Sequence, residues 1–407
     1  MKCRHCQTEL HDTFIDLGFS PPSNAYLRQE DLLRPETYYP LRVMVCRSCW
    51  LVQTQDYAHH DQLFESDYAY FSSTSTSWLK HAADYVGMIV ARLKLDQHSK
   101  VVELAANDGY LLQYVKQRDI PCLGVEPTTS TADAARARNI PIVEDFFGVR
   151  LAKAIVERDG KADLIVANNV LAHVPDINDF LSGMAILLKE EGTITVEFPH
   201  LLNLIAQSQF DTIYHEHFSY LALGSVDRMM RTLGLRVYDV DQIPTHGGSL
   251  RIYACHDKAA HAPTASLSQA LQQERDFGLE NIETYEGFQP RAEKIKLNLL
   301  QFLLEQKRLG KKVVAYGAAA KGNTLLNYSG VHADLLSLVA DAAPSKQGKF
   351  MPGSHIPIVS PSALLETKPD YVLMLPWNLK LEIETQLATI REWDGRFVIA
   401  VPHMQIW

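Results

Sequence analysis

Two pairs of cysteines near the start of the chain constrain its fold more than any other feature. Cys3 and Cys6 form one Cys-x-x-Cys pair, and Cys46 and Cys49 form a second. Each pair places two thiolates on a tight turn, and two facing turns supply the four soft, tetrahedral ligands that Zn²⁺ prefers. Because four cysteines leave no open coordination position, we expect the metal to stabilise a turn-rich module over residues 1–75 rather than to catalyse. Redox chemistry of the two thiol pairs is the alternative.

A repeating pattern of strands and helices predicts the architecture of the rest of the chain. Between residues 76 and 255 short apolar runs alternate with helical patterns, which is typical of a doubly wound, mostly parallel sheet. A polar helical connector follows from about 264 to 309, interrupted at Pro290, and the alternation then restarts in a smaller unit. The predicted strands are 101–105, 121–126, 162–167 and 192–197, then 312–317, 335–341 and 371–375. We expect an α/β fold with a zinc module over 1–75, a central Rossmann-like domain over 76–255, and the connector with a Rossmann-like domain over 256–407.

Composition excludes several classes of protein. The 407 residues carry a formal net charge of −9, so no broad basic field is present to attract a nucleic acid. The N-terminal residues lack the apolar core of a signal peptide, and no apolar run approaches the length that crosses a bilayer. We therefore expect a cytoplasmic monomer that binds small molecules and has neither a nucleic acid nor a membrane as partner.

The loop after the first central strand lies where a ligand would meet the edge of the sheet. Residues 103–109 read Glu-Leu-Ala-Ala-Asn-Asp-Gly and run from that strand into a helix. A dinucleotide-binding loop would need glycines where Ala105 and Asn107 stand, so NAD is disfavoured here. Glu103 and Asp108 complete the candidate loop. We therefore expect a cofactor other than NAD at this edge of the sheet.

Further polar side chains follow the next strands in order. Glu126 ends the second strand, where a carboxylate commonly accepts hydrogen bonds from both ribose hydroxyls, and Pro127 follows it. Asp145 could bind an exocyclic amine, and Phe146 could stack on adenine. Asn168 ends a further strand, within reach of the same crevice. Together these residues predict a site for S-adenosylmethionine.

Six motifs occur in order along nearly the whole chain. They are the four cysteines, Glu-x-x-x-Asn-Asp-Gly from 103, Ala-Asn-Asn-Val-Leu-Ala-His-Val from 167, Tyr-His-Glu-His-Phe from 214, His-Gly-Gly-Ser-Leu-Arg from 246 and Tyr-Gly-Ala-Ala-Ala-Lys-Gly from 316. This order resembles the sugar C-methyltransferases, which act on TDP-linked 4-keto-deoxysugars, and the run from Tyr214 to Tyr220 is its most specific part. The resemblance implies a class I methyltransferase core between a zinc-binding N-terminal module and a Rossmann-like C-terminal module.

Methylation of a carbon needs a carbanion equivalent, which a ketone provides when a proton leaves the neighbouring carbon. The enzyme then needs a base and a group that stabilises the enolate. An imidazole with a pKa near 6.5 suits proton abstraction at neutral pH, so we choose His217 as the base. Glu216 could orient or polarise that imidazole, and Tyr214 could hydrogen-bond the enolate oxygen or sugar hydroxyls. Two alternatives are a metal held by His215 and His217, which a strand would place on one face, and an ordinary structural cluster.

The resemblance adds further residues to this site. His173, just past a strand end, corresponds to another active-site histidine of the family. One of Tyr68 and Tyr70 corresponds to a tyrosine that contacts the sugar, and the sequence does not decide which. Helix packing by His173 and interdomain packing by the tyrosines are the alternatives. By the same resemblance, further active-site positions of the family fall on Tyr214, Glu216 and His217.

Three segments supply candidate contacts to a sugar nucleotide. Asn24 and Tyr26 lie in the long loop between the cysteine pairs. The motif from His246 to Arg251 puts flexible backbone beside a cation, which suits a diphosphate or a sugar, with a hairpin turn as the alternative. In the C-terminal unit, the N–H groups of the loop that begins at Tyr316 could bind a phosphate together with Lys321. The loop lacks the second close-packed glycine that a bound dinucleotide would need. The alternative for this unit is a fold used only as scaffold.

We therefore predict an enzyme that transfers a methyl group from S-adenosylmethionine to a carbon beside the C4 ketone, by preference C3′, of a TDP-linked deoxysugar. Methylation at C5′ is the nearest variant. Rivals of other classes are an NAD-dependent nucleotide-sugar oxidoreductase or epimerase, and a non-catalytic adaptor stapled by zinc.

Protein purified without a chelator should contain about one zinc ion per chain, because four thiolates are predicted to bind it. Plasma emission spectroscopy measures the metal. A folded protein that lacks stoichiometric zinc would contradict the predicted zinc module.

Overall fold

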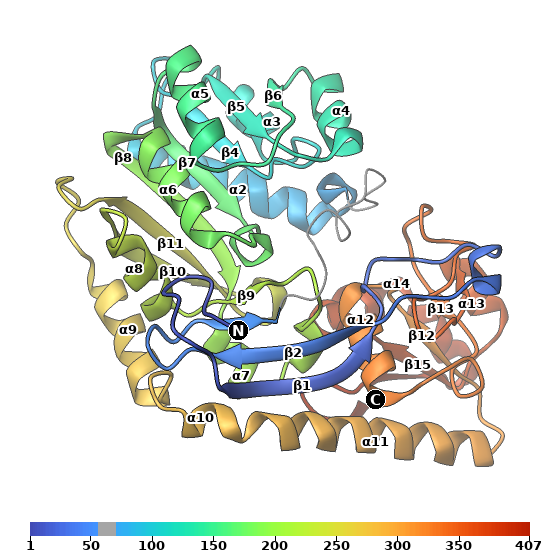
Figure 1. Cartoon of the computed structure of the whole chain (residues 1–407). Coiled ribbons are helices and arrows are strands. Elements are labelled where there is room, and N and C mark those ends of the chain that lie inside the picture. The colour runs from blue at the N-terminus through green and yellow to red at the C-terminus, as the bar shows by residue number, and fades with distance from the viewer. Residues whose placement is uncertain (56–70) are drawn as a thin grey trace.

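The computed structural model describes residues 1–55 and 71–407, and three sheets organise that part of the chain (Figure 1). The first sheet has four strands, the second has seven and the third has six. The predicted fold class, with its N-terminal module and two Rossmann-like units, is confirmed. Tyr68 and Tyr70 lie outside the described residues. Among the described helices, none combines the length and apolar character that a bilayer crossing requires.

The N-terminal sheet is antiparallel and takes its last strand from a distant part of the chain. Its strands lie in the order β1, β2, β3, β9. Val52 pairs with Tyr220, and Gln53 pairs with Ser219. The bounds are Asp12–Ser20 (β1), Tyr39–Val45 (β2), Val52–Thr54 (β3) and Ser219–Tyr220 (β9), with a 3₁₀ turn at Asp31–Leu33 (η1). Through β9 the zinc module is therefore joined directly to the segment that carries Tyr-His-Glu-His.

The central sheet has the strand order β10, β11, β8, β7, β4, β5, β6, which is the order of a class I methyltransferase. Strands β4 to β8 run parallel, whereas β11 is antiparallel to both of its neighbours. The bounds are Val101–Leu104 (β4), Cys122–Val125 (β5), Ile142–Val143 (β6), Ala162–Asn168 (β7), Leu188–Pro199 (β8), Leu235–Ile243 (β10) and Ser249–His256 (β11). The carboxyl ends of β4, β5 and β7 therefore meet at one edge, where such sheets bind ligands.

Helices cover both faces of the central sheet because its strands are apolar on both sides. Val101 and Leu164 pack with α2 and α3 on one face, and Val102 and Ile165 pack with α5 and α6 on the other. The helices and 3₁₀ turns are Ser72–Thr74 (η2), Thr76–Leu93 (α2), Leu112–Lys116 (α3), Thr129–Ala137 (α4), Val149–Asp159 (α5), Leu171–His173 (η3), Ile177–Leu187 (α6), Leu201–Ala206 (α7), Phe210–Thr212 (η4), Leu223–Arg231 (α8) and Thr245–Gly247 (η5).

The helical connector breaks at a different place from the predicted one. Helix α9 (Ala265–Phe277) ends at Gly278, which has φ +88°, and α11 (Phe288–Arg308) follows after the single turn α10 (Glu283–Glu286). The predicted interruption at Pro290 is wrong, because Pro290 lies in the first turn of α11, where no helical N–H bond is needed. Figure 1 shows α11 running along the N-terminal sheet toward the C-terminal domain.

The C-terminal sheet has the order β14, β13, β12, β15, β16, β17, and only β17 is antiparallel to its neighbour. Its predicted strand over 335–341 is shorter than expected. The strands are Val313–Tyr316 (β12), Val339–Ala340 (β13), Ile358–Val359 (β14), Tyr371–Met374 (β15), Arg396–Ile399 (β16) and Gln405–Ile406 (β17). The helices are Ala320–Ser329 (α12), Pro361–Glu366 (α13), Trp377–Leu379 (η6), Lys380–Gln386 (α14) and Ala388–Trp393 (η7).

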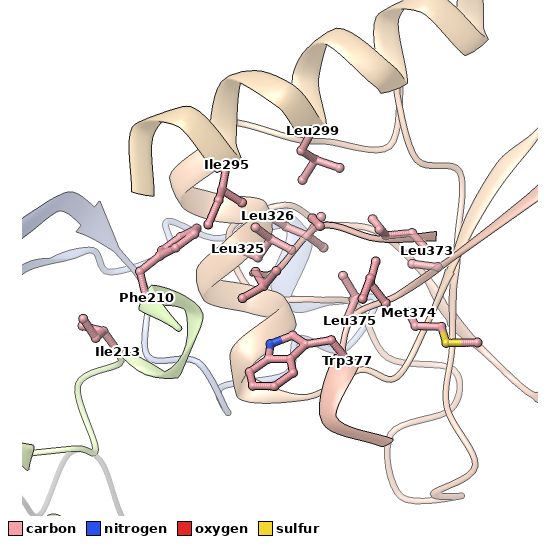
Figure 2. Close-up of a cluster of buried hydrophobic side chains, with 14 of the residues drawn as sticks. Phe210, Ile213, Ile295, Leu299, Leu325, Leu326, Leu373, Met374, Leu375 and Trp377 are labelled. Atoms are coloured by element: carbon pink, nitrogen blue, oxygen red, sulfur yellow. The ribbon is translucent and has the colours of Figure 1, made fainter. Parts of the chain in front are cut away.

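A buried apolar cluster joins the C-terminal domain to the middle of the chain (Figure 2). Phe210 and Ile213, which precede Tyr-His-Glu-His, are fully buried in the same cluster as Leu326 of α12, Leu299 of α11 and Trp377. Burial of each large apolar side chain stabilises the fold by about 1.5–3 kcal/mol. The C-terminal domain therefore holds the segment before the candidate active site.

Candidate active site

The four predicted metal ligands form one cluster. The Sγ atoms of Cys3, Cys6, Cys46 and Cys49 all lie within 4.8 Å of one another, and the Cys3–Cys49 and Cys6–Cys46 pairs are each 3.5 Å apart. Zn–S bonds of about 2.3 Å in a tetrahedron imply S–S separations of about 3.8 Å. The geometry fits a structural zinc ion. Within residues 1–55 and 71–407 this is the one group of three or more candidate ligands that could hold a metal.

The loop after β4 has the backbone conformation that brings it to the sheet edge. Ala105, Asn107 and Gly109 have φ of +56°, +48° and +77°. The Asn107 N–H donates to Glu126 Oε2 at 2.9 Å, and the Thr128 N–H donates to Glu126 Oε1 at 3.0 Å. The structure therefore brings the predicted loop and the predicted ribose-binding carboxylate together at the ends of β4 and β5.

Two asparagines at the end of β7 indicate that a polar ligand binds beside this loop. Asn168 Oδ1 and both side-chain amide atoms of Asn169 are buried and have no hydrogen-bond partner in the described part of the chain. Leaving a buried polar group unpaired costs about 1–3 kcal/mol, so such groups normally bond a ligand or water. Because β7 is the neighbour of β4, these amides lie at the same edge of the sheet as the loop after β4.

Two of the predicted cofactor residues are interior carboxyl groups. Burial raises the pKa of Glu103 well above its ordinary value, and the charges of Glu126 and Asp108 raise it further. Glu103 is almost fully buried, so its neutral form is favoured. Asp108 is buried, accepts a hydrogen bond from the Ser73 hydroxyl and lies 3.5 Å from the Arg138 guanidinium. Both carboxyl groups support the loop from within.

The remaining predicted cofactor residues lie nearer the surface. Asp145 forms an ion pair with Arg150 at 2.6 Å. The Phe146 side chain is 53% exposed, which is unusual for so large an apolar ring, and Pro127 is half-buried. An exposed ring near a nucleoside crevice suits stacking on a base.

His217 lies at the centre of the candidate catalytic site. Its Nδ1 is 2.8 Å from the Thr212 carbonyl oxygen, which can only accept, so Nδ1 carries the proton and Nε2 keeps its lone pair. Burial lowers the pKa of His217 well below its ordinary value, and the nearby His173 lowers it further. The imidazole is therefore neutral at neutral pH and has the lone pair that a base needs.

Aromatic rings surround His217. The ring centroids of Tyr214 and His173 lie 3.9 Å and 4.7 Å away, and that of Tyr220 lies 6.0 Å away. Burial lowers the pKa of His173 to about 4, so this ring is also neutral. The structure thus brings His173 from one motif beside Tyr214 and His217 from another.

Glu216 is held by Asn24 rather than by the imidazole of His217. Asn24 Nδ2 donates to both carboxylate oxygens, at 2.9 Å and 2.7 Å. Burial raises the pKa of Glu216 to about 7, while the bond from Asn24 acts to lower it. The predicted orienting role of Glu216 is corrected, because the Thr212 carbonyl orients the ring.

His215 faces the N-terminal module. Its Nε2 is 3.3 Å from the Pro40 carbonyl oxygen, and its ring packs edge-on against Tyr39. Residues 215–216 form a turn rather than a strand, so the expected convergence of His215 and His217 on one face does not occur. The described residues therefore give no support to a catalytic metal at this segment.

The C-terminal domain supplies a cation to the same site. Lys321 lies in the first turn of α12, with its Nζ 3.0 Å from Asn378 Oδ1 and 4.8 Å from the centroid of the Trp377 ring. Its positive charge contributes to the lowered pKa values of His217 and His246. The structure therefore gathers a lysine from the C-terminal domain and histidines from the central domain around one site.

Two other predicted substrate residues lie at the rim of this site. Burial lowers the pKa of His246 to about 4, and its ring packs against Trp78 at a centroid distance of 5.4 Å. The Tyr26 hydroxyl donates to the Ala318 carbonyl oxygen at 2.5 Å. Tyr26 therefore joins the loop between the cysteine pairs to the C-terminal domain.

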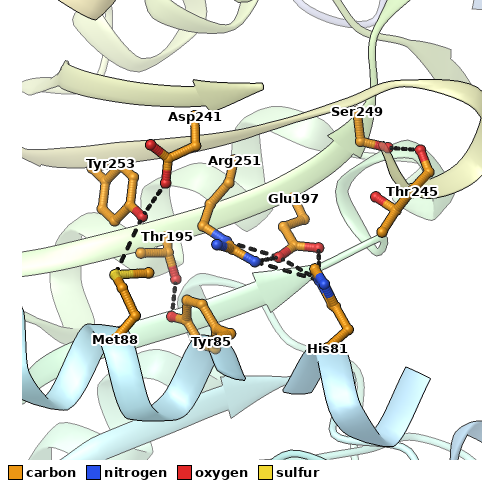
Figure 3. A network of polar contacts seen from close by, with 10 residues as sticks. All are labelled: His81, Tyr85, Met88, Thr195, Glu197, Asp241, Thr245, Ser249, Arg251 and Tyr253. Carbon is orange, nitrogen blue, oxygen red and sulfur yellow. Dashed lines mark hydrogen bonds and ion pairs between the residues drawn. The ribbon is translucent and has the colours of Figure 1, made fainter. Parts of the chain in front are cut away.

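Arg251 belongs to a buried polar network within the central sheet (Figure 3). Its Nε donates to Glu197 at 2.8 Å, and His81 Nε2 lies 3.0 Å from both oxygens of that carboxylate. The Arg251 guanidinium also lies 4.6 Å from the centroid of the Tyr85 ring. The structure does not place Arg251 as the predicted cation for a diphosphate, because Glu197 compensates its charge inside the protein.

Two residues that hold the site were not predicted from the sequence. Thr212 acts through its backbone carbonyl, so its side chain gives no signal. Asp211 is fully buried, and its carboxylate accepts a hydrogen bond of 2.7 Å from Trp377 Nε1. A carboxylate between the apolar residues Phe210 and Ile213 is a sequence signal for a buried polar contact. The partner could not be identified from it, because Trp377 lies in another domain.

Three family models match successive parts of the chain. A zinc binding domain matches residues 3–64, a methyltransferase domain matches 78–240, and a C-methyltransferase C-terminal domain matches 244–402. The C-methyltransferase NovU of Streptomyces niveus is 35% identical over 408 residues, which cover 100% of this chain and 96% of that protein. The similarity therefore extends through all three modules.

Solved structures resemble part of the chain. Magnesium protoporphyrin IX methyltransferase from Synechocystis PCC 6803, with bound SAM, is 14% identical at a TM-score of 0.34 and covers 44% of this chain and 79% of that one. The PH0226 protein from Pyrococcus horikoshii OT3 is 13% identical at a TM-score of 0.39 and covers 50% of this chain and 100% of that one. The full-length sequence match is the comparison that bears on activity.

The substitution Asn24→Leu should raise the pKa of Glu216 above its present value of about 7, because it removes the bond that favours the carboxylate and leaves burial unopposed. Carbon-13 NMR titration of glutamate-labelled protein measures this pKa, and Glu216→Gln assigns the resonance. An unchanged titration in Asn24→Leu would show that Asn24 does not support the charged form.

Proposed function

The chain belongs to the family of C-methyltransferases with an N-terminal zinc-binding domain, and from this we propose that it methylates C3′ of a TDP-linked 4-keto-deoxysugar with S-adenosylmethionine as donor. The full-length match supports the enzyme class. One observation carries the proposed mechanism: a partly buried, neutral His217 whose Nδ1–H is held by a carbonyl lies beside a phenol and near an ammonium group.

The crevice at the ends of β4, β5 and β7 would hold the donor. Glu126 suits the ribose hydroxyls, the exposed Phe146 ring suits adenine, and the buried amides of Asn168 and Asn169 offer hydrogen bonds to polar groups. When bound, S-adenosylmethionine supplies an electrophilic methyl group on a sulfonium. The crevice lies in the same domain as His173 and His217, which supports a single site for donor and acceptor.

His217 would remove a proton from the carbon beside the C4 ketone. The proton would move to Nε2, and the electron pair of the C–H bond would move onto the ketone oxygen as an enolate. The enolate carbon would form the new C–C bond as the S–CH3 bond of the sulfonium breaks, with S-adenosylhomocysteine as the leaving group. A positioned general base typically contributes about 10²–10⁴-fold to the rate. The lowered pKa keeps His217 in its basic form before the reaction, and the negative enolate would stabilise the imidazolium after it.

Tyr214 and Lys321 would stabilise the negative charge that develops on the substrate. The phenol of Tyr214 stacks over His217, and the Lys321 ammonium approaches from α12 of the C-terminal domain. Burial lowers the pKa of Lys321, whereas the Asp211 carboxylate raises it, so Asp211 favours the charged lysine. Donors held in a water-poor site stabilise an anionic oxygen far more than they would in water.

The sugar nucleotide would bind where the N-terminal loop meets the C-terminal domain. Asn24 reaches Glu216, and Tyr26 reaches Ala318 in the loop before α12. Lys321 is the predicted cation in this region. Because Glu197 already neutralises Arg251, Lys321 is the candidate to bind an anionic oxygen of the substrate. C5′ methylation remains the nearest variant of this proposal.

Calorimetry with S-adenosylhomocysteine and with NAD should show tight binding of the first and none of the second, because the loop after β4 lacks the glycines of a dinucleotide site. Binding of NAD alone would instead favour a nucleotide-sugar oxidoreductase or epimerase.

The substitution His217→Asn should abolish solvent-deuterium exchange of the substrate's α proton while S-adenosylhomocysteine still binds, because the base is lost and the cofactor crevice is not. Mass spectrometry of a panel of TDP-4-keto-sugars in D₂O measures the exchange. His215→Asn is the matched control, since His215 faces Pro40 and should leave exchange intact. Full exchange in His217→Asn would assign the base to His173, Tyr214 or another residue.

A further inference from the structure

Thr54, the last residue of β3, hydrogen-bonds the backbone at His217, the proposed base. Its hydroxyl donates to the His217 carbonyl oxygen, and its N–H donates to the Phe218 carbonyl oxygen at 3.1 Å. Beyond these two bonds, the pairing of β3 with β9 continues the same contact to Ser219 and Tyr220. The zinc-binding sheet therefore holds the carbonyl of the peptide that follows His217, and the N–H of that peptide donates to the Ala172 carbonyl oxygen of the central domain at 2.8 Å.

The metal cluster fixes the position of β3 over a short path. The Gln53 side chain is fully buried, and its Nε2 donates to Cys3 Sγ at 3.2 Å. The Cys46 N–H donates to the Leu51 carbonyl oxygen at 3.0 Å, which closes the second cysteine turn onto the start of β3. Any movement of the sulfur atoms would consequently displace Thr54.

Arg4 extends the same link to the second histidine of the site. Arg4 lies between Cys3 and Cys6 in the sequence, and its backbone N–H donates to Gln53 Oε1 at 2.8 Å. Its guanidinium donates to the Thr54 carbonyl oxygen at 3.0 Å and to the Pro175 carbonyl oxygen at 2.9 Å, and lies 5.2 Å from the centroid of the Phe218 ring. One side chain thus contacts the segments that follow both His173 and His217.

We infer that Arg4 and Thr54 are positioning residues through which the zinc cluster fixes the geometry of His217 and His173. The segment from Tyr214 to Phe218 has no helix or strand of its own to fix it, so its placement depends on its neighbours. Proton abstraction requires reacting atoms about 3–3.5 Å apart, and a displacement of about 1 Å costs about 10²-fold in rate. This inference gives the zinc module a part in catalysis without any contact between metal and substrate, and it rests on the proposed function of His217.

The test compares Thr54→Val, which removes the hydroxyl at constant shape, with Thr54→Ser, which restores it. Thr54→Val should lower kcat and the rate of α-proton exchange by about 10–100-fold, as loss of a supporting hydrogen bond does at metal sites, with KM and S-adenosylhomocysteine affinity within about two-fold. Thr54→Ser should recover most of the rate. Thr232→Val is the matched control, since it removes a similar hydroxyl-to-carbonyl bond at the end of α8. Equal rates in Thr54→Val and Thr232→Val would overturn the inference.

A second measurement does not depend on activity. Long-range ¹H–¹⁵N NMR of the histidine rings in the zinc-loaded protein, assigned with His217→Asn and His173→Asn, should show both rings shifted in Thr54→Val and in Arg4→Lys, with zinc content unchanged. Resonances identical to those of the wild type in both variants would overturn the inference even if no sugar were turned over. Failure of the wild type to exchange the α proton of any keto-sugar would instead refute the proposed function.

Discussion

The segment from Phe210 to Tyr220 belongs to all three modules at once, and the candidate site depends on this sharing. Its first residues are buried with α12 and Trp377 of the C-terminal domain, its last two form a strand of the zinc-binding sheet, and His217 between them packs on His173 of the central domain. Since 213–218 includes neither a helix nor a strand, neighbouring modules supply the contacts that define it. A free methyltransferase domain would therefore retain the ends of β4, β5 and β7 but lose the contacts that place His217.

Burial sets the charge state of this site. Removing an imidazole from water disfavours its charged form, and the pKa values of His173 and His246 accordingly fall to about 4. The same effect acts in the opposite direction on a carboxyl group, so the pKa of Glu216 rises to about 7. The site therefore combines neutral imidazoles with the positive charge of Lys321, as the proposed proton abstraction requires.

The sequence predicted those features that depend on spacing and order. The cysteine pairs, the strand alternation and the polar residues at strand ends follow from local patterns, and the structure assembles them as expected. The pairing of Asn24 with Glu216 and of Asp211 with Trp377 could not be predicted, because each joins residues from different modules. The role of Thr212 was hidden because a backbone carbonyl has no residue signature, and Arg251 was misjudged because its partner Glu197 lies on a neighbouring strand.

Strand β9, which completes the N-terminal sheet from a distant part of the chain, has a consequence for synthesis of the protein. β3 ends at Thr54 and β9 begins at Ser219, so about 165 residues must leave the ribosome before the first sheet can be completed. At about 5–20 residues per second this takes roughly 8–33 s. Throughout that interval the outer side of β3 presents unpaired N–H and C=O groups, which readily join the strands of other chains. Pairing with β9 removes this edge, and the shortness of β3, only three residues long, limits what another chain can pair with until then.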